Sequence, residues 1–416
     1  MPKLLIVTTM ASTLSAFLLP YARHFRKIGW TVDAMANGVS VCPECREAFD
    51  QCHEMPFSRS PLNIENFSIN SKIREIATNG EYDIVHVHTA VAAFVTRLAL
   101  RKMRGKPRPK IVYTSHGFHF YEGGGTLKNA AFAALERLAG DLTDHTITIN
   151  EDDYEAALAY KISEPERLSL MPGLGIDLNR QRGASADEVK KLHAALGLEK
   201  SNWPFFMAED YGAALAHKVS TAGNLSPEQV KAEAKKLQTK LKLKNDDELF
   251  LMAEEFAPIK RHEDAIRALA ITGMANFHLA FAGAGPLEDS MKQLASKLGV
   301  APRVHFLGER HDIPLLMRSA RALILPSARE GLSRSVMEAI NLGVPVLGAY
   351  VRGIRDLIDS PARGILFPAG NQAALAAAMI LIMEDRRPIS PTPDPLWSID
   401  HLLSEHEALY RKLLQS

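Results

Sequence analysis

Short apolar stretches alternate with amphipathic stretches along the first part of the chain. KLLIVTT, from residue 3, has the unbroken apolar character of a buried strand, and AFLLPYARHFRKIGW after it repeats its apolar positions at helical spacing. The same order recurs in YDIVHVHT and AVAAFVTRLALRKMRG, in KIVYTSHG and LKNAAFAALERLAG, and in HTITIN and EDDYEAALAYK. This alternation predicts an α/β fold in which helices cover both faces of a parallel sheet.

A second series of apolar stretches begins near residue 249. It consists of LFLMAEEF (249–256), FHLAFAGAG, VHFLGE, ALILPS, VPVLGA and GILFPAG, and it predicts a second Rossmann-like sheet. Glycine and proline interrupt the pattern in PGLGIDLNR, so we expect domains over residues 1–178 and 179–395, followed by a last helix in residues 396–416. Ligands of such sheets bind beyond the carboxyl ends of the strands, so residues that follow strands are the functional candidates.

A duplicated stretch lies between the two series. Residues 188–211 align without gaps with residues 233–256, and 10 of the 24 positions are identical. About two matches would arise by chance, so our hypothesis is that one helix-plus-strand unit was copied in tandem. We expect the second copy to supply the first strand of the second sheet, because only that copy is followed by a well-placed lysine, and residues 188–232 to form an insert.

Charge and apolar content exclude several classes of protein. Lysines and arginines (49) nearly balance aspartates and glutamates (48), so no overall positive field attracts nucleic acid. The apolar run at the N-terminus is too short for a signal peptide, which favours a cytoplasmic protein. The longest other apolar run, residues 373–383, has about half the length that a membrane-spanning helix needs.

The three cysteines cluster in CPECREAFDQCH. Cys42, Cys45 and Cys52 with the adjacent His53 offer four ligands that zinc prefers. Neighbouring side chains such as Cys52 and His53 rarely point at one metal, so the alternative is three reduced cysteines in a connection between strands. The spacing alone leaves both interpretations open, and no Asp-x-Asp metal motif occurs at a strand end, where NEDD (150–153) is better explained as a helix start capped by Asn150.

Two glutamates follow the strand ALILPS, with seven residues between them in REGLSRSVMEA. Glu330 and Gly331 lie in the expected turn, a helix begins near Ser333 or Ser335, and Glu338 lies about 10 Å further along. Amides at a helix N-terminus favour a diphosphate, and a glycine allows close approach. The structural alternative is a capping box, SVME, in which Glu338 bonds back to the amide of Ser335.

The chain resembles the retaining glycosyltransferases of family 4, which have the GT-B fold. The resemblance rests on EGLSRSVMEAINLGVPVLGAYVRGIRDLI, which is similar to the Glu-x7-Glu motif of that family, and on VHVHTAVAAFVTRLA, YTSHGFHFY, HTITINEDD, GIDL and LPSAREGL in the expected order. It covers most of the chain except the duplicated stretch, and it is closest to the bacterial branch that builds capsules, exopolysaccharides and lipid-linked oligosaccharides. It implies two Rossmann-like domains that face each other across a cleft, with the C-terminal helix crossing back to the first domain.

The resemblance also implies roles for individual residues of the donor site. Glu338 would bind the ribose of a nucleotide, Glu330 the hydroxyls of the donor sugar, and Lys260 the leaving diphosphate. His116, at the end of a strand in the first domain, would act near the reaction centre, whereas His86 is better explained as a histidine tolerated in the sheet. The remaining expected donor contacts are Arg261 and the amides of Gly331, Leu332 and Ser333. No metal or other cofactor is expected, because the helix N-terminus and Lys260 would replace a cation.

Two departures from the family pattern place parts of the site in doubt. Many relatives have an arginine five residues before the lysine, and Glu255 stands there in this chain. Arg310 or Arg334 are candidates to compensate, beside Arg261. TTMAS replaces the glycine pair expected after the first strand, so acceptor contacts there should differ.

The first domain is expected to bind the acceptor. Arg59, in PFSRSP, and His119 are the candidate contacts. Residues 101–110 hold six basic residues in ten, and the helix after the first strand adds Arg23, Arg26 and Lys27. Such a surface suits an anionic membrane and a polyprenyl-diphosphate-linked acceptor, and a solvated basic loop is the equally simple alternative. The basic run lacks interleaved aromatic residues, so a nucleic-acid partner is not expected.

The sequence therefore predicts a glycosyltransferase (EC 2.4) at the inner face of the cell membrane. It would move a hexose or N-acetylhexosamine from a nucleotide diphosphate sugar, with UDP the expected nucleotide, to a lipid-linked or growing surface-polysaccharide acceptor. A sugar-nucleotide epimerase of the same fold and a non-catalytic sugar-nucleotide-binding protein are the alternatives. The donor sugar, the acceptor linkage and the oligomeric state cannot be read from the residues.

Overall fold

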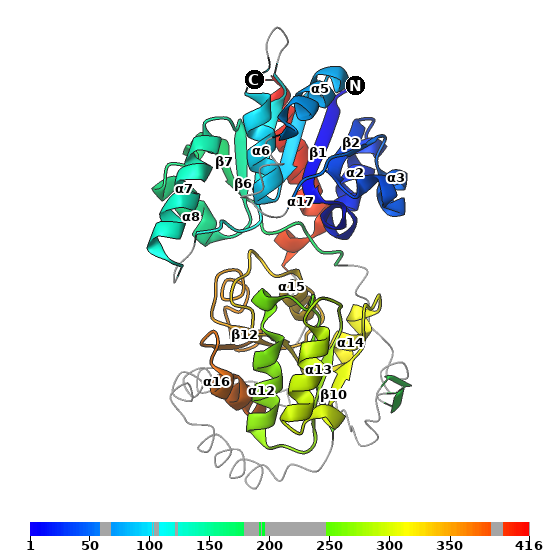
Figure 1. Ribbon diagram of the computed structural model, residues 1–416, viewed down its shortest axis with the longest axis vertical. Coiled ribbons are helices and arrows are strands. Elements are labelled where there is room, and N and C mark those ends of the chain that lie inside the picture. The colour runs from blue at the N-terminus through cyan, green and yellow to red at the C-terminus, as the bar shows by residue number, and fades with distance from the viewer. Residues whose placement is uncertain are drawn as a thin grey trace. The chain divides into compact units, whose positions relative to one another are not determined.

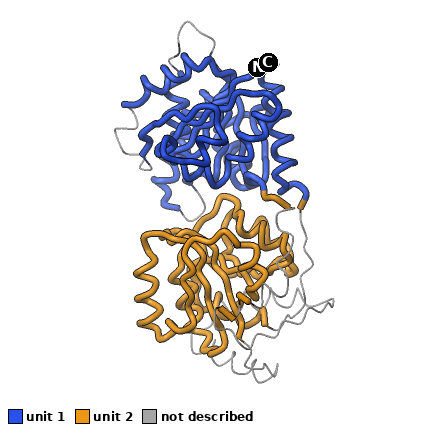
Figure 2. The backbone as a smooth tube through the Cα atoms, turned by 90° about the vertical axis from the view of Figure 1, so that its right-hand side faces the viewer, with its two compact units in different colours: residues 1–175, 395–416 blue, residues 176–394 orange. Residues whose placement is uncertain are grey.

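The computed structural model divides the chain into two compact units. Residues 1–175 and 395–416 form the first unit and residues 176–394 the second (Figure 2). The structure describes residues 1–58, 68–101, 103, 108–120, 124–178, 191–192, 194–195, 247–383 and 394–415.

The first unit is built on a parallel sheet of seven strands in the order β3-β2-β1-β4-β5-β6-β7. The strands are β1 Lys3–Met10, β2 Thr31–Asn37, β3 Cys52–Glu54, β4 Ile84–His88, β5 Lys110–Ser115, β6 His145–Thr148 and β7 Leu168–Leu170. β1 lies beside both β2 and β4, with Leu4 in register with Val32 and Ile84. The predicted strands of this unit are confirmed, and the apolar pattern missed β2, β3 and β7.

Helices cover both faces of this sheet, as predicted. They are α1 Ala11–Thr13, a π-helical turn Leu14–Leu18, α2 Leu19–Lys27, α3 Pro43–Ala48, α5 Asn70–Gly80, α6 Ala90–Leu100, α7 Thr126–Gly140, α8 Glu151–Ala159 and α17 Ile399–Gln415 (Figure 1). Leu4 and Ile6 of β1 lie in one apolar cluster and their neighbours Leu5 and Val7 in another, because successive side chains of a strand point to opposite faces.

The C-terminal helix α17 belongs to the core of the first unit. Its Leu402 and Tyr410 lie in the same buried cluster as Phe25 of α2, and the Tyr410 and Phe25 rings are 5.0 Å apart. This confirms that the last helix returns to the first domain.

The second unit contains a parallel sheet of six strands in the order β10-β9-β8-β11-β12-β13. The strands are β8 Glu248–Met252, β9 Phe277–Phe281, β10 Val304–Phe306, β11 Ala322–Leu325, β12 Val346–Ala349 and β13 Gly364–Phe367. The helices are α12 His262–Thr272, α13 Glu288–Lys297, α14 Ile313–Ser319, α15 Arg334–Asn341 and α16 Gln372–Leu381. The two sheets confirm the predicted fold class.

β8 settles which copy of the duplicated stretch provides a strand. It lies between β9 and β11 in the sheet, so the second copy holds the strand, as predicted. The strand ends at Met252 rather than Phe256, and the residues after it form a loop. The first copy lies almost wholly outside the described residues.

The apolar run at 373–383 is buried in the second unit. It forms most of α16, whose Leu375 and Met379 belong to the same core cluster as Phe250 of β8. Within the part of the chain that the structure describes, no helix is long and apolar enough to cross a membrane.

Candidate functional site

A cluster of charged side chains lies beyond the carboxyl ends of β8 and β11. The Nζ atom of Lys260 is 2.6 Å from Glu254 Oε2 and 2.8 Å from Glu330 Oε1. Glu254 also accepts a hydrogen bond of 2.6 Å from the hydroxyl of Ser335, at the start of α15. Both predicted residues, Lys260 and Glu330, are thus brought together, and Glu254 joins them.

Burial and pairing set the charges of this cluster. Burial alone would lower the pKa of Lys260, but Glu254 and Glu330 outweigh that effect and raise it above its usual range. Burial raises the pKa of Glu330, Lys260 opposes this rise, and Glu254 adds to it. The lysine is therefore firmly protonated, and the two carboxylates beside it compete for its charge.

The loop that carries Glu254 is held by a close backbone contact. A Cβ atom on Gly283 would lie 2.1 Å from the carbonyl oxygen of Glu254, and one on Gly285 would lie 2.8 Å from the amide nitrogen of Phe256. The GAGP segment therefore needs its glycines to pack against this loop. This packing accounts for the glycines of GAGP, so a bound dinucleotide is not needed to explain them.

Helix α15 begins at Arg334, and Ser333 is its N-cap. The Ser333 hydroxyl accepts from the Val336 amide at 3.4 Å. Glu338 instead accepts from Arg334 Nε at 2.8 Å, one turn into the helix. The structural alternative of a capping box at Ser335 is therefore excluded, because Ser333 is the N-cap and Glu338 pairs with Arg334.

The amide of Ser333 is already engaged. It donates to the Gly353 carbonyl at 3.3 Å, and Gly353 has a φ of 75° and packs against the Gly331 carbonyl so closely that a Cβ would lie 2.1 Å away. The expectation that Gly331, Leu332 and Ser333 all present exposed amides to a diphosphate is corrected for Ser333. Its hydroxyl caps the helix and its amide fixes the Gly353 loop.

The arginines expected to help bind phosphate are paired with carboxylates. Arg261 is hydrogen-bonded through two nitrogens to Asp264, which also accepts from Gln372 at 2.8 Å. Arg310 forms a two-pronged pair with Asp312. Glu255, at the position where relatives have arginine, is exposed. The acid of this loop that contacts Lys260 is Glu254, which precedes Glu255 in the sequence. Glu254 was assigned to the expected strand and was therefore not predicted as a site residue.

A column of histidine rings stands at the carboxyl ends of β4 and β5 in the first unit. His88 Nδ1 and His116 Nε2 are 3.1 Å apart, and their rings stack at 5.3 Å. The His86 ring lies 4.0 Å from that of His88, and His86 is hydrogen-bonded to Tyr410 of α17 and, at 2.7 Å, to Thr114. The favoured interpretation of His86 as a histidine of the sheet agrees with these partners.

These histidines are neutral near pH 7. Burial lowers the pKa of His116 to about 4, and it lowers the pKa values of His86 and His88 well below the usual range. A neutral imidazole has one N–H and one bare nitrogen, so His116 can offer a directed hydrogen bond to a ligand but no positive charge.

The carboxyl end of β1 is tied to the residue that follows β4. Thr9 donates its amide to the Thr89 hydroxyl at 3.0 Å, and the two hydroxyls are 2.8 Å apart. Thr89 has a φ of 61° and a ψ of 133°, a conformation that non-glycine residues rarely adopt. Such strain is typical of functional sites, and here it accompanies the threonines that replace the family's glycine pair.

The acceptor candidates are only partly described. The His119 ring lies 5.3 Å from the Phe132 ring of α7, and Arg59 lies outside the described residues. Half of the basic segment 101–110 also lies outside them. Its Arg108 pairs with Asp144 at 2.9 Å, and in the other basic region Arg26 pairs with Asp50 at 3.0 Å.

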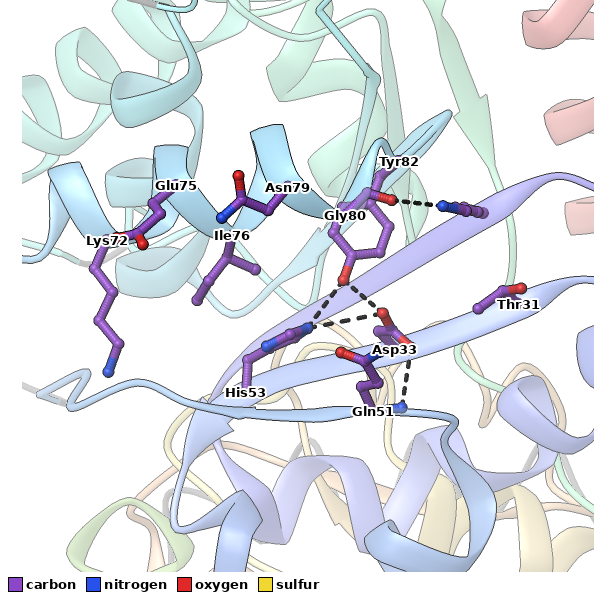
Figure 3. A pocket seen from close by; sticks show the side chains of 11 residues that line it. Thr31, Asp33, Gln51, His53, Lys72, Glu75, Ile76, Asn79, Gly80 and Tyr82 are labelled. Atoms are coloured by element: carbon purple, nitrogen blue, oxygen red, sulfur yellow. Dashed lines mark hydrogen bonds and ion pairs between the residues drawn. The ribbon is translucent and has the colours of Figure 1, made fainter.

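A polar pocket of about 370 Å³ lies at the opposite, amino edge of the first sheet (Figure 3). Lys3 and Thr31, at the starts of β1 and β2, line it together with Lys72 and Asn79 of α5. In its wall, the Tyr82 hydroxyl donates to the buried Asp33 at 2.6 Å and contacts His53 Nε2 at 3.0 Å (Figure 3). This network fixes the wall of the pocket.

The cysteine cluster does not gather around one point. Cys42 is joined to Cys45 by a disulfide, Cys52 is a free thiol in β3, and His53 belongs to the network with Tyr82. Among the described residues, no group of three or more histidine, cysteine, aspartate or glutamate side chains is placed to hold a metal ion.

Both halves of the chain match models of known families. Residues 16–180 match the model described as Glycosyltransferase Family 4, and residues 233–392 match that of Glycosyl transferases group 1.

The chain is also similar to individual proteins over most of its length. EpsD of Bacillus subtilis, provisionally described as a glycosyltransferase, is 29% identical over 90% of this chain and 85% of its own length. The UDP-Gal:alpha-D-GlcNAc-diphosphoundecaprenol alpha-1,3-galactosyltransferase of Escherichia coli is 23% identical over 74% of this chain and 67% of its own. The solved structure of HepE from Anabaena in complex with UDP has the same fold, with a TM-score of 0.67 and 18% identity over 100% of this chain and 98% of its own.

Proposed function

The chain is a glycosyltransferase (EC 2.4) of family 4, group 1, with the GT-B fold, and from this premise we propose that it transfers a hexose or N-acetylhexosamine from a UDP-sugar, with retention, to a lipid-linked or growing surface-polysaccharide acceptor. The observation that carries the donor half of the proposal is the buried Lys260 beside Glu254 and Glu330, next to the N-terminus of α15.

Lys260 is the residue suited to the leaving diphosphate. Negative charge grows on the diphosphate as the bond to the sugar breaks, and a fixed cation in a partly buried site stabilises that charge. The N-terminus of α15 adds favourable dipole. In this proposal Glu330 holds sugar hydroxyls and Glu338, which the helix cap does not use, holds the ribose.

The transfer itself needs no protein nucleophile. The acceptor hydroxyl oxygen bonds to the anomeric carbon on the face that the diphosphate leaves, so the configuration is retained. The hydroxyl proton passes to a diphosphate oxygen, and the electron pair of the broken bond stays with the diphosphate. His116, neutral at pH 7, donates a hydrogen bond to the donor sugar rather than acting as a cation.

One relative supports the proposed acceptor class. The similar enzyme of Escherichia coli acts on a sugar linked to diphosphoundecaprenol. We propose an acceptor of the same chemical type, a polyprenyl-diphosphate-linked sugar, with Arg59 and His119 as contacts and with the reaction at the inner face of the cell membrane.

The test is nucleotide release. The protein is incubated with UDP-glucose, UDP-galactose and UDP-N-acetylglucosamine, each with and without undecaprenyl-diphosphate-linked N-acetylglucosamine, and released UDP is measured. UDP release that requires the lipid acceptor supports the proposal. Conversion of one UDP-sugar into another without an acceptor would instead identify an epimerase, and binding without turnover a sensor.

Nucleotide affinity tests the assignment of Glu338. Glu338→Gln keeps the shape of the side chain and removes the charge that would hold the ribose hydroxyls, so UDP should bind about tenfold more weakly. An unchanged UDP affinity would show that Glu338 serves only the pair with Arg334.

A further inference from the structure

The Lys260 cluster carries more negative than positive charge. Two carboxylates, Glu254 and Glu330, lie within 2.8 Å of one ammonium group, so the three groups sum to one negative charge when all are ionised. Their side chains are only 12% exposed, against 19% for Lys260, so water screens them weakly. The cluster repels an anion unless its charge changes.

A sugar-nucleotide diphosphate brings two further negative charges to this lysine. Each oxygen that approaches Lys260 also approaches the two carboxylates that hold it. Like charges at such distances disfavour ionisation, and the usual result is that one acid takes a proton. The pKa of Glu330 is already raised before any such approach, by burial and by Glu254, while Lys260 opposes the rise.

We propose that Glu254 and Glu330 share one proton whenever a donor diphosphate binds Lys260, so that donor binding takes up a proton from water. The inference rests on the proposed function, because it assumes that a nucleotide diphosphate binds here. It makes Glu254 a positioning residue: its carboxylate holds Lys260 and Ser335 in place, and its charge sets the pH dependence of donor affinity.

The other groups around the cluster do not supply this proton. His262, at the start of α12, stacks on Phe256 at 4.2 Å, and burial lowers its pKa to about 4, so it stays neutral. Arg334 of α15 pairs with Glu338. Ser335, also of α15, donates to Glu254 and does not titrate near neutrality.

Proton linkage fixes the sign of the effect. The proton is bound more tightly in the complex than in the free protein, so donor affinity rises as the pH falls. Between the pKa of the shared carboxylate in the free protein and its higher value in the complex, the dissociation constant should increase up to tenfold for each pH unit of rise, which is the limit for one proton.

Calorimetry with UDP-glucose and UDP-N-acetylglucosamine measures the proton directly. The diphosphate diester of these probes does not itself titrate near neutrality. Titrations near pH 7 in buffers of different ionisation enthalpy should show uptake of about one proton per bound nucleotide sugar by the unaltered protein. Absence of net uptake across the neutral range would overturn the inference and leave the proposed function standing.

Two matched variants locate the proton. Glu254→Gln keeps the hydrogen-bonding shape but removes one charge, so proton uptake should fall towards zero and affinity near pH 8 should increase several-fold. Glu255→Gln removes the same charge from the adjacent, exposed side chain and should keep the uptake of the unaltered protein. Equal behaviour of the two variants would overturn the assignment to Glu254.

The failures of the two proposals differ. If neither nucleotide sugar binds, the proposed donor class falls and takes this inference with it. If they bind without proton uptake and Glu254→Gln does not gain affinity, only the inference falls. Should Glu254→Gln fail to fold, the measurement on the unaltered protein still decides the presence of uptake.

Discussion

The two sheets carry very different side chains at their carboxyl edges. In the first unit, the carboxyl ends of β4 and β5 carry stacked rings, His88 and His116, whose pKa values burial lowers. In the second, the loops after β8 and β11 carry Glu254, Lys260 and Glu330, which hold one another by charge. One edge excludes charge and the other concentrates it.

The difference follows from the position of these residues in strands or in loops. His86 and His88 belong to the central strand β4, which helices cover. Their side chains are buried and, among the described residues, do not reach a charged partner. The three charged residues follow their strands, where loops can bring opposite charges together. The buried histidines of the first unit therefore offer hydrogen bonds, whereas the three loop residues of the second unit offer charge.

The largest expected effect comes from removing the cation. Lys260→Met should lower kcat in the nucleotide-release assay by about a hundred- to a thousandfold, because it removes the charge that stabilises the leaving group. Lys292→Met is the control, since Lys292 is an exposed lysine of the same unit. Equal kcat values for the two variants would contradict the assigned role of Lys260.

Removing the neutral His116 from the first unit should lower activity less than removing Lys260 from the second. His116→Ala should lower kcat/KM by about a hundredfold through misplacement of the donor sugar. Because the pKa of His116 is near 4, the pH profile of kcat should show no step from this histidine near pH 6.5. The control is His24→Ala, at the surface pair with Glu407. A profile step near pH 6.5 that His116→Ala removes would show that His116 works as an acid or base.

Acid should weaken the first unit more than the second. Five of its described histidines, at positions 86, 88, 116, 145 and 406, have lowered pKa values, against three in the second unit, at positions 262, 278 and 305. A lowered pKa means that the unfolded chain binds more protons, so the stabilisation is complete above about pH 6.5 and is lost as the pH falls towards 4.

Glu330 acts in the opposite direction within the second unit. Its raised pKa contributes stability that is present at low pH and is lost as the pH rises through the raised value. Hydrogen exchange resolved by peptide, corrected for intrinsic rates, should therefore show a larger loss of protection in the first unit between pH 7 and 5. Each histidine adds up to about 1.4 kcal/mol per pH unit. Equal losses in both units would contradict the comparison.

The smallest effect is expected at the far end of the histidine column. Tyr410→Phe removes the hydrogen bond to His86 and should cost about 1 to 3 kcal/mol of unfolding free energy, because a buried nitrogen loses its partner. Donor affinity should not change. Tyr160→Phe, at an exposed ring of the same unit, is the control in denaturant unfolding. A large loss of donor affinity in Tyr410→Phe would extend the functional site to α17.

Most strands were predictable from the sequence because short runs rich in apolar residues, such as those of β1, β8 and β11, stand out between stretches with helical spacing. β2 was missed because Asp33 interrupts its run, and the three-residue edge strands β3 and β7 carry too little pattern. Lys260 and Glu330 were found because both follow expected strands and match positions that the family resemblance assigns to the donor site. Glu254 was missed because the apolar run LFLMAEEF extends past the true strand end at Met252.

The sequence alone could not exclude a capping box at Ser335. Ser333 and Ser335 both precede the apolar face of α15, and only Ser335 has a glutamate three positions later, so the motif left this alternative open although Ser333 is the N-cap. Backbone contacts such as the approach of Gly353 to Gly331 join segments that the sequence does not relate. The engaged amide of Ser333 could be found only in three dimensions.

The position of α17 determines when the first unit can finish folding during synthesis. Leu402 and Tyr410 complete an apolar cluster with Phe25, and Gly175 comes so close to Ile399 that a Cβ would lie 2.7 Å from its Cα. A ribosome delivers these partners only after the whole of residues 176–394 has emerged. Until then the part of the first sheet's apolar cluster that α17 covers stays exposed, a target for chaperones. An isolated fragment ending at residue 175 should fold only when the α17 peptide is supplied in trans.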